Sequence, residues 1–443
     1  MNNSGESILK MKLDKPINPN YCATVVYLPA VRFDVKDLDN LKGVSIFGYN
    51  VIVSKDTPSE LGIFFSTETQ LSDEYCYENN LYREESRIGN LNKDKSSKGY
   101  LDKNRRIRAI KFKGNVSNGL FMPLKSLEYT GIDTSLLKEG DEFDILNGKE
   151  ICRKYEVPKK EGRKQEIVDR GFVRADKKFI PEHIDTENFF KNWDKIPPET
   201  EVIITQKLHG TSIRIAHTYV NYKPKLVDRV ARFFGAKIKQ YEYAYLYGSR
   251  KVIKDANNPN QNHYYEQDIW TNEGKKLDGL LPENYVVYGE LVGWTPEGQP
   301  LQKGYTYGIP KGTCELYIYR ITIINEKGLM TDLSWQAVKE FCSKNGLKYV
   351  PELFKIDMRM LCDSDFQMVK ALLDTRYFDG NENSHFRNCL WLGEDKELVD
   401  EGICIRADGL LPKILKAKSP KFLEHETKIL DTGEEDLESS QNV

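Results

Sequence analysis

The pattern of apolar and polar positions predicts two regions of short strands, one on each side of a charged segment. In the first region, residues 24–28 and 51–53 are β-branched or aromatic, and glycines separate such runs. In the second region, strand-like runs occur at 202–204, 213–215, 286–293, 316–321, 400–406 and 414–418. Helices are predicted at 189–193, 223–239, 265–280, 334–341 and 365–378. Together these elements predict an α+β protein.

The charged segment at 156–170 contains proline and glycine and has the composition of a linker. We therefore expect a first module at 1–160, a linker at 161–180 and a larger domain at 181–428. The last residues, 429–443, are acidic and are predicted to form a disordered tail.

The first module carries a basic stretch at 105–113, in which Lys111 and Lys113 alternate with apolar residues as on a strand with one basic face. Residues 67–104 before it are polar and are predicted to form a long exposed loop. Many short strands with a basic face are typical of a small OB-type barrel, which binds nucleic-acid backbones electrostatically. A solvated strand face is an equally good interpretation. The candidate phosphate contacts are Arg106, Arg108, Lys111 and Lys113.

Composition restricts the possible partners. The chain has 443 residues and a net charge of -2, so any contact with nucleic acid has to come from local patches. No apolar run reaches the roughly 18 residues that span a bilayer, and the first residues lack a secretory signal pattern, so no membrane partner is expected. The 8 cysteines are scattered without a C-x-x-C pair, which predicts neither a zinc ribbon nor a disulfide framework and makes the cytoplasm the expected location.

The most informative stretch is 205–212, Thr-Gln-Lys-Leu-His-Gly-Thr-Ser, which lies between two strand-like runs. It predicts a tight turn that contains Lys207 and Gly210, with the glycine in a backbone conformation that other residues avoid. A lysine amine is a nucleophile only when neutral, and burial or a nearby cation favours that form. A surface lysine beside a hairpin glycine is the commoner meaning of such a motif, so the case depends on the rest of the chain.

Four further charged residues stand within strand-like runs. Glu290 and Glu401 lie among apolar residues, while Lys416 and Lys418 share one face of a strand, about 6.6 Å apart. Because unpaired buried charge is costly, the two lysines predict a polyanion between them, and the two glutamates predict a cation, either a metal or Lys207. Each glutamate taken alone is more simply a structural salt bridge. The whole set fits transfer of a nucleotide to lysine, and no P-loop motif is present.

In this order the motifs resemble those of the covalent nucleotidyltransferase superfamily of polynucleotide ligases and capping enzymes. His209 stands where DNA ligases usually have aspartate, as in the RNA-ligase form, and residues 105–124 are similar to the OB module that precedes the catalytic domain in one branch of ATP-dependent RNA ligases. Arg320 departs from relatives that carry an acid there. The resemblance extends from about residue 20 to 426. The matching segments are 207–212 (K-L-H-G-T-S), 249–251 (S-R-K), 288–291 (Y-G-E-L), 316–319 (L-Y-I-Y), 401–403 (E-G-I) and 415–418 (L-K-A-K).

The resemblance implies an amino-terminal OB-like barrel followed by a ligase-type nucleotidyltransferase domain of antiparallel sheets with flanking helices. It implies an ATP-dependent RNA ligase, monomeric, that joins RNA 3′-hydroxyl and 5′-phosphate ends, in a nicked duplex or free, with Mg²⁺ or Mn²⁺. Lys207 would form the lysyl-AMP intermediate, Glu290 and Glu401 would organise the metal, and Lys416 and Lys418 would hold the α-phosphate. The other implied nucleotide contacts are Gln206, Leu208, His209, Gly210, Arg250 and Tyr319, of which Tyr319 would stack on adenine.

Two other classes of protein remain as alternatives. A DNA ligase or a GTP-using capping enzyme would usually place its OB module after the catalytic domain, and His209 argues against both. An OB-fold RNA-binding protein with an inactive transferase domain would not need the complete set of glutamates and lysines.

Overall fold

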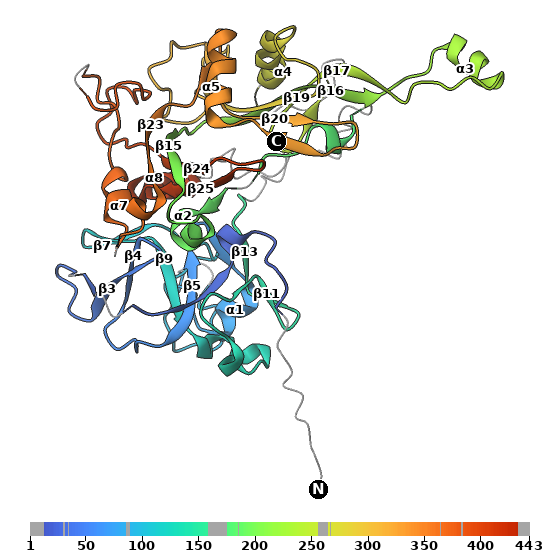
Figure 1. The fold of residues 1–443 in the computed structure, drawn as a ribbon. Coiled ribbons are helices and arrows are strands. Elements are labelled where there is room, and N and C mark those ends of the chain that lie inside the picture. Colours follow the sequence, from blue (N-terminus) through green and yellow to red (C-terminus); the bar gives the residue numbers. More distant parts are fainter. Residues whose placement is uncertain are drawn as a thin grey trace. The chain divides into compact units, whose positions relative to one another are not determined.

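The computed structural model describes residues 13–29, 32–33, 35–85, 89–157, 175–184, 186–255, 265, 267–363, 365–381 and 384–432. It divides into two compact units (Figure 1). The first unit contains the chain up to Glu156 together with Leu423–Thr432, and the second spans Val157–Phe422. Both units combine helices with mainly antiparallel sheets, as predicted from the sequence. Residues 158–174 of the expected linker region and residues 433–443 of the expected tail lie outside the described residues.

The first unit is built from short strands around a four-stranded sheet with the order β10-β1-β5-β9. Smaller sheets are formed by β2-β3-β4, β6-β13, β7-β8 and β11-β12. The strands are β1 (Ala23–Tyr27), β2 (Arg32–Phe33), β3 (Leu41–Ile46), β4 (Tyr49–Ser54), β5 (Leu61–Ser66), β6 (Thr69–Leu71), β7 (Ile110–Phe112), β8 (Asn115–Ser117), β9 (Gly119–Pro123), β10 (Glu142–Phe143), β11 (Ile145–Leu146), β12 (Lys149–Glu150) and β13 (Cys152–Lys154).

The central sheet of this unit is buried on both faces. Val25 on β1 and Phe65 on β5 pack into one apolar core. The neighbouring residues Val26 and Phe64 pack into a second apolar core on the other face of the sheet. A sheet covered on both faces needs apolar side chains at successive positions. This explains why these two strands are continuously apolar rather than alternating.

The prediction of a long exposed loop at 67–104 was wrong. This segment contains β6 and helix α1 (Asp73–Glu78), whose amino end is capped by the side chain of Ser72. Tyr75 and Cys76 on the helix are fully buried, as are Tyr82 and Leu101 further along. A few buried apolar side chains in an otherwise polar sequence are enough to pack the segment against the core.

The basic stretch at 105–113 forms an extended strand only at β7. Arg105 and Lys113, on either side of it, have φ angles of 58° and 46°, which interrupt the extended backbone. The guanidinium of Arg106 is buried, lies 3.0 Å from the Glu68 carboxylate and pairs with Asp431. The prediction that Arg106 belongs to a solvent-facing phosphate-binding surface is therefore wrong, because its guanidinium is buried and already paired with two acidic groups.

The acidic partners of this stretch come largely from the last helix, α8 (Pro420–Asp431), whose residues from Leu423 onward belong to the first unit. Lys111 lies 2.7 Å from Glu424, and Arg108 contacts Asp431 at 3.4 Å. Residues 429–431, expected in the tail, are thus helical. The sequence shows the amphipathic spacing of this helix, but it does not show which surface the helix covers.

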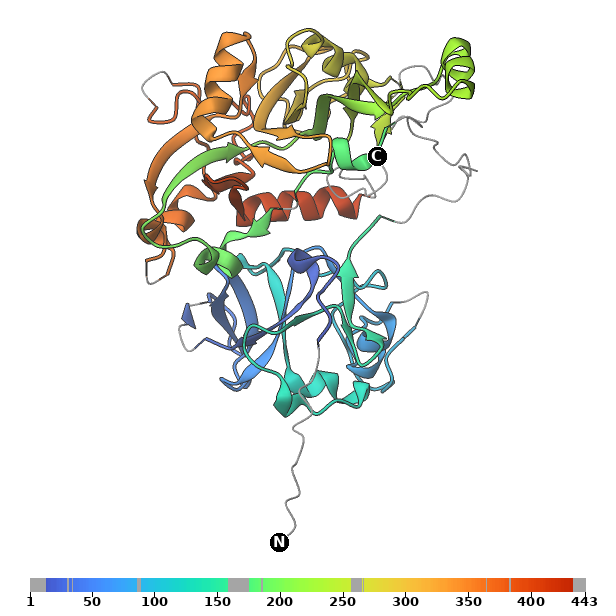
Figure 2. The same cartoon turned by 45° about the vertical axis from the view of Figure 1, so that its right-hand side comes forward.

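The second unit contains two sheets (Figure 2). One has the order β14-β25-β24-β15-β23, and the other has the order β18-β17-β16-β19-β20-β21 with β22 beside β20. The strands are β14 (Glu187–Asn188), β15 (Glu201–Lys207), β16 (Thr211–Asn221), β17 (Tyr241–Gly248), β18 (Ile253–Lys254), β19 (Tyr285–Gly293), β20 (Cys314–Ile324), β21 (Met330–Asp332), β22 (Lys348–Tyr349), β23 (Glu352–Asp357), β24 (Gly402–Ala407) and β25 (Lys413–Lys418).

Two helices of this unit are much shorter than the sequence predicted. The stretch at 265–280 forms α4 (Ile269–Gly274) and a 3₁₀ turn that ends at Leu277, and the stretch at 365–378 forms α7 (Gln367–Leu372). The remaining helices are α2 (Phe189–Asn192), α3 (Leu226–Phe233), α5 (Trp335–Lys344) and α6 (Met358–Leu361). Among the residues that the structure describes, no helix has the length and apolar character to cross a bilayer.

The motif at 205–212 connects the two sheets rather than forming a hairpin. Lys207 is the last residue of β15 in one sheet, and Thr211 begins β16 in the other. The large core of the unit contains apolar side chains from both strands, including Ile203 and Ile213. Residues 208–210 therefore lie where the chain leaves one sheet and enters the other.

The buried pair in the first unit leads to a stability prediction. Replacing Arg106 by alanine leaves the buried Glu68 carboxylate without its main cation and should lower the free energy of unfolding by about 3–5 kcal/mol. Urea unfolding measures the loss. Arg153→Ala is the matched control, because that side chain is 61% exposed, and it should change stability by no more than about 0.5 kcal/mol. Equal effects of the two variants would contradict the assignment.

Candidate active site

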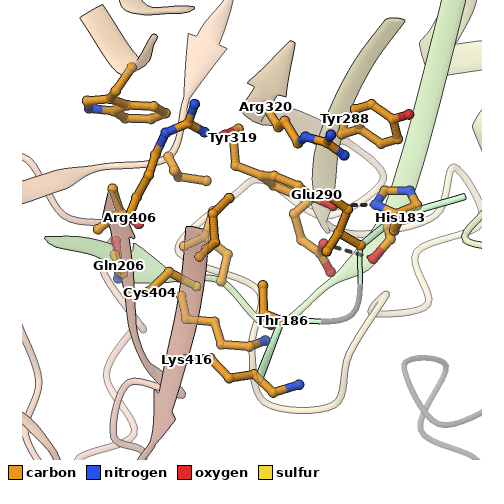
Figure 3. Close-up of a pocket in the computed structure, with 18 of the residues that line it drawn as sticks. His183, Thr186, Gln206, Tyr288, Glu290, Tyr319, Arg320, Cys404, Arg406 and Lys416 are labelled. Carbon is orange, nitrogen blue, oxygen red and sulfur yellow. Dashed lines mark hydrogen bonds between the residues drawn. The ribbon is translucent and has the colours of Figure 1, made fainter. Parts of the chain in front are cut away.

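A pocket in the second unit is lined by side chains from both sheets (Figure 3). Gln206 and Lys416 come from the five-stranded sheet, and Glu290 and Tyr319 come from the other sheet. Of the residues predicted from the sequence, the pocket wall contains Gln206, Lys207, Leu208, Arg250, Glu290, Tyr319 and Lys416. A pocket between two sheets can receive polar groups from each, so residues distant in sequence meet there.

Lys207 is held by a buried carboxylate. Its Nζ lies 2.7 Å from Oε1 of Glu401, and the Nζ of Lys418 lies 3.1 Å from the same oxygen. The Glu401 side chain is fully buried, and the two lysine side chains are 10% and 11% exposed. One carboxylate therefore pairs with two ammonium groups, and the tip of Lys207 is directed into the unit rather than into bulk water.

The strand register brings these three charges together. Lys207 on β15 pairs with Gly402 on β24, and Gly402 pairs with Lys418 on β25. Gly402 has a φ of 145°, and a Cβ there would lie 2.0 Å from the carbonyl oxygen of Ala417. Only glycine permits this close approach, which places the preceding Glu401 between the two lysines.

Gly210 has a different function from the one predicted. It is absent from the residues with positive φ, so it does not adopt the left-handed conformation expected for it. A Cβ at this position would instead lie 2.1 Å from the carbonyl oxygen of Leu291 on β19. The glycine is needed because the backbones approach closely where β16 begins.

His209 lies behind the pocket wall. Its ring is buried against Tyr305 and Phe422, and its Nδ1 is 3.7 Å from Oε2 of Glu401. The backbone N–H of His209 donates to the hydroxyl of Tyr307 at 2.7 Å. His209 and Gly210 thus support the position of Lys207 and do not line the pocket, although the sequence suggested that they contact the nucleotide.

Glu290 reaches the pocket from β19. It is opposite Ser212 in the sheet, and the Ser212 hydroxyl donates to its Oε2 at 3.3 Å. Within the described residues, no three His, Cys, Asp or Glu side chains are placed to hold a metal ion. Two buried carboxylates nevertheless fit Mg²⁺ or Mn²⁺, since such ions are commonly held by one or two carboxylates with water and substrate phosphates.

The two predicted phosphate-binding lysines differ in their surroundings. Lys416 lines the pocket together with Arg250. Lys418, two residues further along β25, faces Glu401, and its Nζ lies 5.1 Å from the centre of the Phe422 ring. The carboxylate of Glu401 is already occupied by two ammonium groups, so any metal there would share it with them.

The aromatic end of the pocket is formed by Tyr319, His183 and Tyr288. The Tyr319 hydroxyl lies 2.5 Å from Nδ1 of His183, and the His183 ring packs edge-on against Tyr288. Burial, reinforced by Arg250 and Arg214, holds the pKa of His183 well below its ordinary value, so the ring is neutral near pH 7.

Arg320, which departed from the family pattern, is accommodated by a new acidic partner. Its guanidinium forms two hydrogen bonds with Asp332, one of them 2.9 Å long, and it lies 4.9 Å from the centre of the Tyr288 ring. The pair is buried within the sheet. The basic residue therefore lines the pocket with its charge paired by Asp332.

Gln206 is fixed by three polar contacts. Its side-chain carbonyl accepts from the backbone N–H of Leu390 at 2.9 Å, and its amide donates to Asp400 at 2.6 Å and to the backbone carbonyl of Leu390 at 3.4 Å. Burial raises the pKa of Asp400 to about 6. The Gln206 side chain thus presents a rigid edge to the pocket.

Several pocket residues were absent from the sequence-based candidates. They are His183, Thr186, Ser212, Tyr288, Arg320, Trp335, Cys404 and Arg406. Tyr288 and Ser212 belong to recognised motifs, so the motif boundaries could have indicated them. His183 and Arg406 carry no local signal, because they reach the pocket only through the tertiary fold.

Part of the chain matches the model of a known family. The family model described as RNA ligase matches residues 200–418, which is a little under half of the chain. The match contains every predicted residue of the pocket and supports the RNA ligase function expected from the sequence. The search of curated proteins found no match.

Solved structures of the RNA ligase from Naegleria gruberi share the fold over most of the chain. A mutant with ATP and Mn has a TM-score of 0.56 at 16% identity, covering 93% of this chain and 99% of that one. The ligase with pyrophosphate has a TM-score of 0.57 at 16% identity, covering 92% and 98%. A mutant with AMP and Mn has a TM-score of 0.56 at 16% identity, covering 91% and 98%. At this identity the likeness is one of fold.

The raised pKa of Asp400 leads to a pH prediction. Its folded-state pKa of about 6 exceeds the ordinary value of 3.8, so the folded state binds this proton more tightly. The stabilisation that protonated Asp400 gives to the folded state is fully present below about pH 4 and is lost as the pH rises through 6. The stability of the wild type relative to Asp400→Asn should therefore fall by about 2.5 kcal/mol between pH 4 and pH 7.

Urea unfolding at a series of pH values measures this difference. Glu394→Gln removes a neighbouring exposed carboxylate and serves as the control, with no comparable change expected. A pH-independent difference between wild type and Asp400→Asn would contradict the raised pKa.

Proposed function

We propose that the protein is an ATP-dependent RNA ligase that joins RNA 3′-hydroxyl and 5′-phosphate ends through a lysyl-AMP intermediate. The observation that carries the proposal is the position of Lys207, which lines a pocket between two sheets and contacts Glu401 at 2.7 Å. The RNA ligase family match over residues 200–418 supports it. So does the shared fold with a ligase solved with ATP, AMP, pyrophosphate and Mn.

The first step is transfer of AMP to Lys207. The Nζ attacks the α-phosphorus of ATP, a P–N bond forms, the bond to the β-phosphate oxygen breaks, and pyrophosphate leaves. Attack requires an unprotonated amine, and Oε1 of Glu401 is placed to accept the ammonium proton. The phosphates of a bound nucleotide would also compete with Glu401 for the ammonium groups of Lys207 and Lys418.

The other charged groups position the phosphates, because phosphoryl transfer depends mainly on alignment and charge neutralisation. Lys416 and Arg250 line the pocket and are suited to bind the phosphates. A divalent ion, Mg²⁺ or Mn²⁺, held by Glu290 with Glu401 would neutralise charge on the phosphate oxygens. Tyr319 would stack on adenine, and Gln206 would face the edge of the base.

In the next steps AMP passes to an RNA 5′-phosphate, and a 3′-hydroxyl then attacks that phosphate and releases AMP. The RNA would reach the pocket as a nicked duplex or as free ends, bound by a monomeric enzyme. We assign the first unit to an OB-like module and the second unit, after a linker at 161–180, to the adenylyltransferase domain. The short antiparallel sheets of the first unit support the OB-like assignment, and Arg108, Lys111 and Lys113 remain its candidate RNA contacts.

The covalent step is tested by labelling with α-³²P-ATP. Lys207→Ala should abolish the labelled adenylate, because it removes the amine that attacks the α-phosphorus. Lys276→Ala removes an exposed lysine of the same unit and should label normally. Labelling of the Lys207→Ala protein would show that the nucleophile is a different residue. Parallel reactions with α-³²P-GTP distinguish a ligase from a capping enzyme, for which guanylate would form instead.

Sealing of RNA tests the phosphate contacts. Lys416→Ala should reduce the joining of a nicked RNA substrate by roughly a hundredfold or more, since a charge that stabilises the transition state contributes about 3 kcal/mol. The matched control, Lys413→Ala, changes another lysine on β25 that pairs with Glu187 and lies outside the pocket wall. Full activity of Lys416→Ala would exclude the phosphate contact. A parallel DNA nick distinguishes an RNA ligase from a DNA ligase.

A further inference from the structure

Helix α3 is an exposed amphipathic helix that the proposed ligase reaction does not use. None of its residues is buried. Its large apolar side chains face solvent, and those of Leu226, Val227, Phe233 and Phe234 are between 77% and 86% exposed, with Val230 at 53%. An isolated helix of eight residues is marginal in water, so an apolar face of this size indicates a partner.

The apolar and basic residues of α3 occupy opposite faces. At about 100° per residue, the five apolar side chains fall within an arc of about 120°. Arg229 and Arg232 lie on the other side of the helix, next to the position of Lys225. A basic face opposite a bulky apolar face is the pattern of a helix that lies in a membrane interface.

The helix lies at the end of an arm formed by β16 and β17. These strands pair through Asn221 and Tyr241, and the segment between them contains α3. Figures 1 and 2 both show α3 at the tip of this arm, away from the sheet to which the strands belong. A projecting tip can contact a flat surface without obstruction from the rest of its unit.

The charge of the arm tip, residues 222–240, is strongly positive. It contains six lysines and arginines and one acidic residue, Asp228. The Asp228 carboxylate accepts hydrogen bonds from the Tyr222 hydroxyl at 2.6 Å and from the backbone N–H of Lys225 at 2.7 Å, so it caps the helix. The basic residues are Lys223, Lys225, Arg229, Arg232, Lys237 and Lys239.

We propose that the arm tip docks on an anionic lipid surface, with α3 parallel to the membrane plane. The apolar side chains enter the boundary between headgroups and acyl chains, and the lysines and arginines contact lipid phosphates. An RNA would bind the cations but leave the apolar side chains in water. A protein groove would cover the apolar face without using the surrounding cations. The expectation of no membrane partner concerned spanning segments, and a helix that lies in the interface needs none.

Flotation of the full-length protein with vesicles tests this proposal. The protein should float with phosphatidylcholine–phosphatidylserine vesicles, remain unbound with phosphatidylcholine alone, and lose binding as salt is added. The double substitution Phe233→Ser with Phe234→Ser should reduce the bound fraction roughly tenfold or more, because it removes the aromatic side chains that enter the interface. Arg229→Glu with Arg232→Glu should have a similar effect.

Leu410→Ser is the matched control, because Leu410 is 82% exposed elsewhere in the same unit. It should bind vesicles like the wild type. All variants should retain adenylate formation, since none of the changed residues lines the pocket. This readout separates failure of membrane docking from failure of the proposed ligase function.

Four outcomes would overturn the proposal. The first is the absence of binding to anionic vesicles by the wild type, and the second is equal binding by the double phenylalanine variant. The third is loss of RNA binding in that variant, measured by gel shift without vesicles, which would identify RNA as the occupant. The fourth is a wild-type dimer in sedimentation velocity that the variant lacks, which would identify a second copy of the chain.

Discussion

The fully buried carboxylate of Glu401 determines the arrangement of the active site. Without its cations, a carboxylate at this depth would destabilise the fold by several kcal/mol. Lys207 and Lys418 supply those cations, and the register of three neighbouring strands places both beside one oxygen. The interaction that permits burial of the acid is therefore also the interaction that positions Lys207, the proposed nucleophile.

This arrangement links folding to the proposed chemistry. In the protein without nucleotide, the ammonium groups of Lys207 and Lys418 share the single carboxylate of Glu401. Nucleotide phosphates introduce a second set of anions into the same pocket. Because Lys207 lies at the end of β15, where the chain passes from one sheet to the other, it can approach substrate groups held by both sheets.

The two basic stretches of the chain are similar in composition, but their cations have different neighbours in the structure. In the first unit, cations of the stretch at 105–113 pair with Glu68, Glu424 and Asp431, two of which come from helix α8. In the arm tip at 222–240, the single acid caps a helix and the cations remain at the surface. Both stretches are rich in lysine and arginine in the sequence. Only the residues that surround them in the folded structure distinguish them.

The sequence by itself determined the α+β class of fold and singled out Lys207, Glu290, Glu401, Lys416 and Lys418 as candidate site residues, because strand periodicity and charge within apolar runs are local properties. It could not determine that Arg106 is buried, that Gly210 serves close packing, or that His209 lies behind the pocket wall. Nor could it place His183 in the pocket or helix α8 in the first unit. These features depend on contacts between residues far apart in the chain, and such contacts exist only after the sheets have paired and packed.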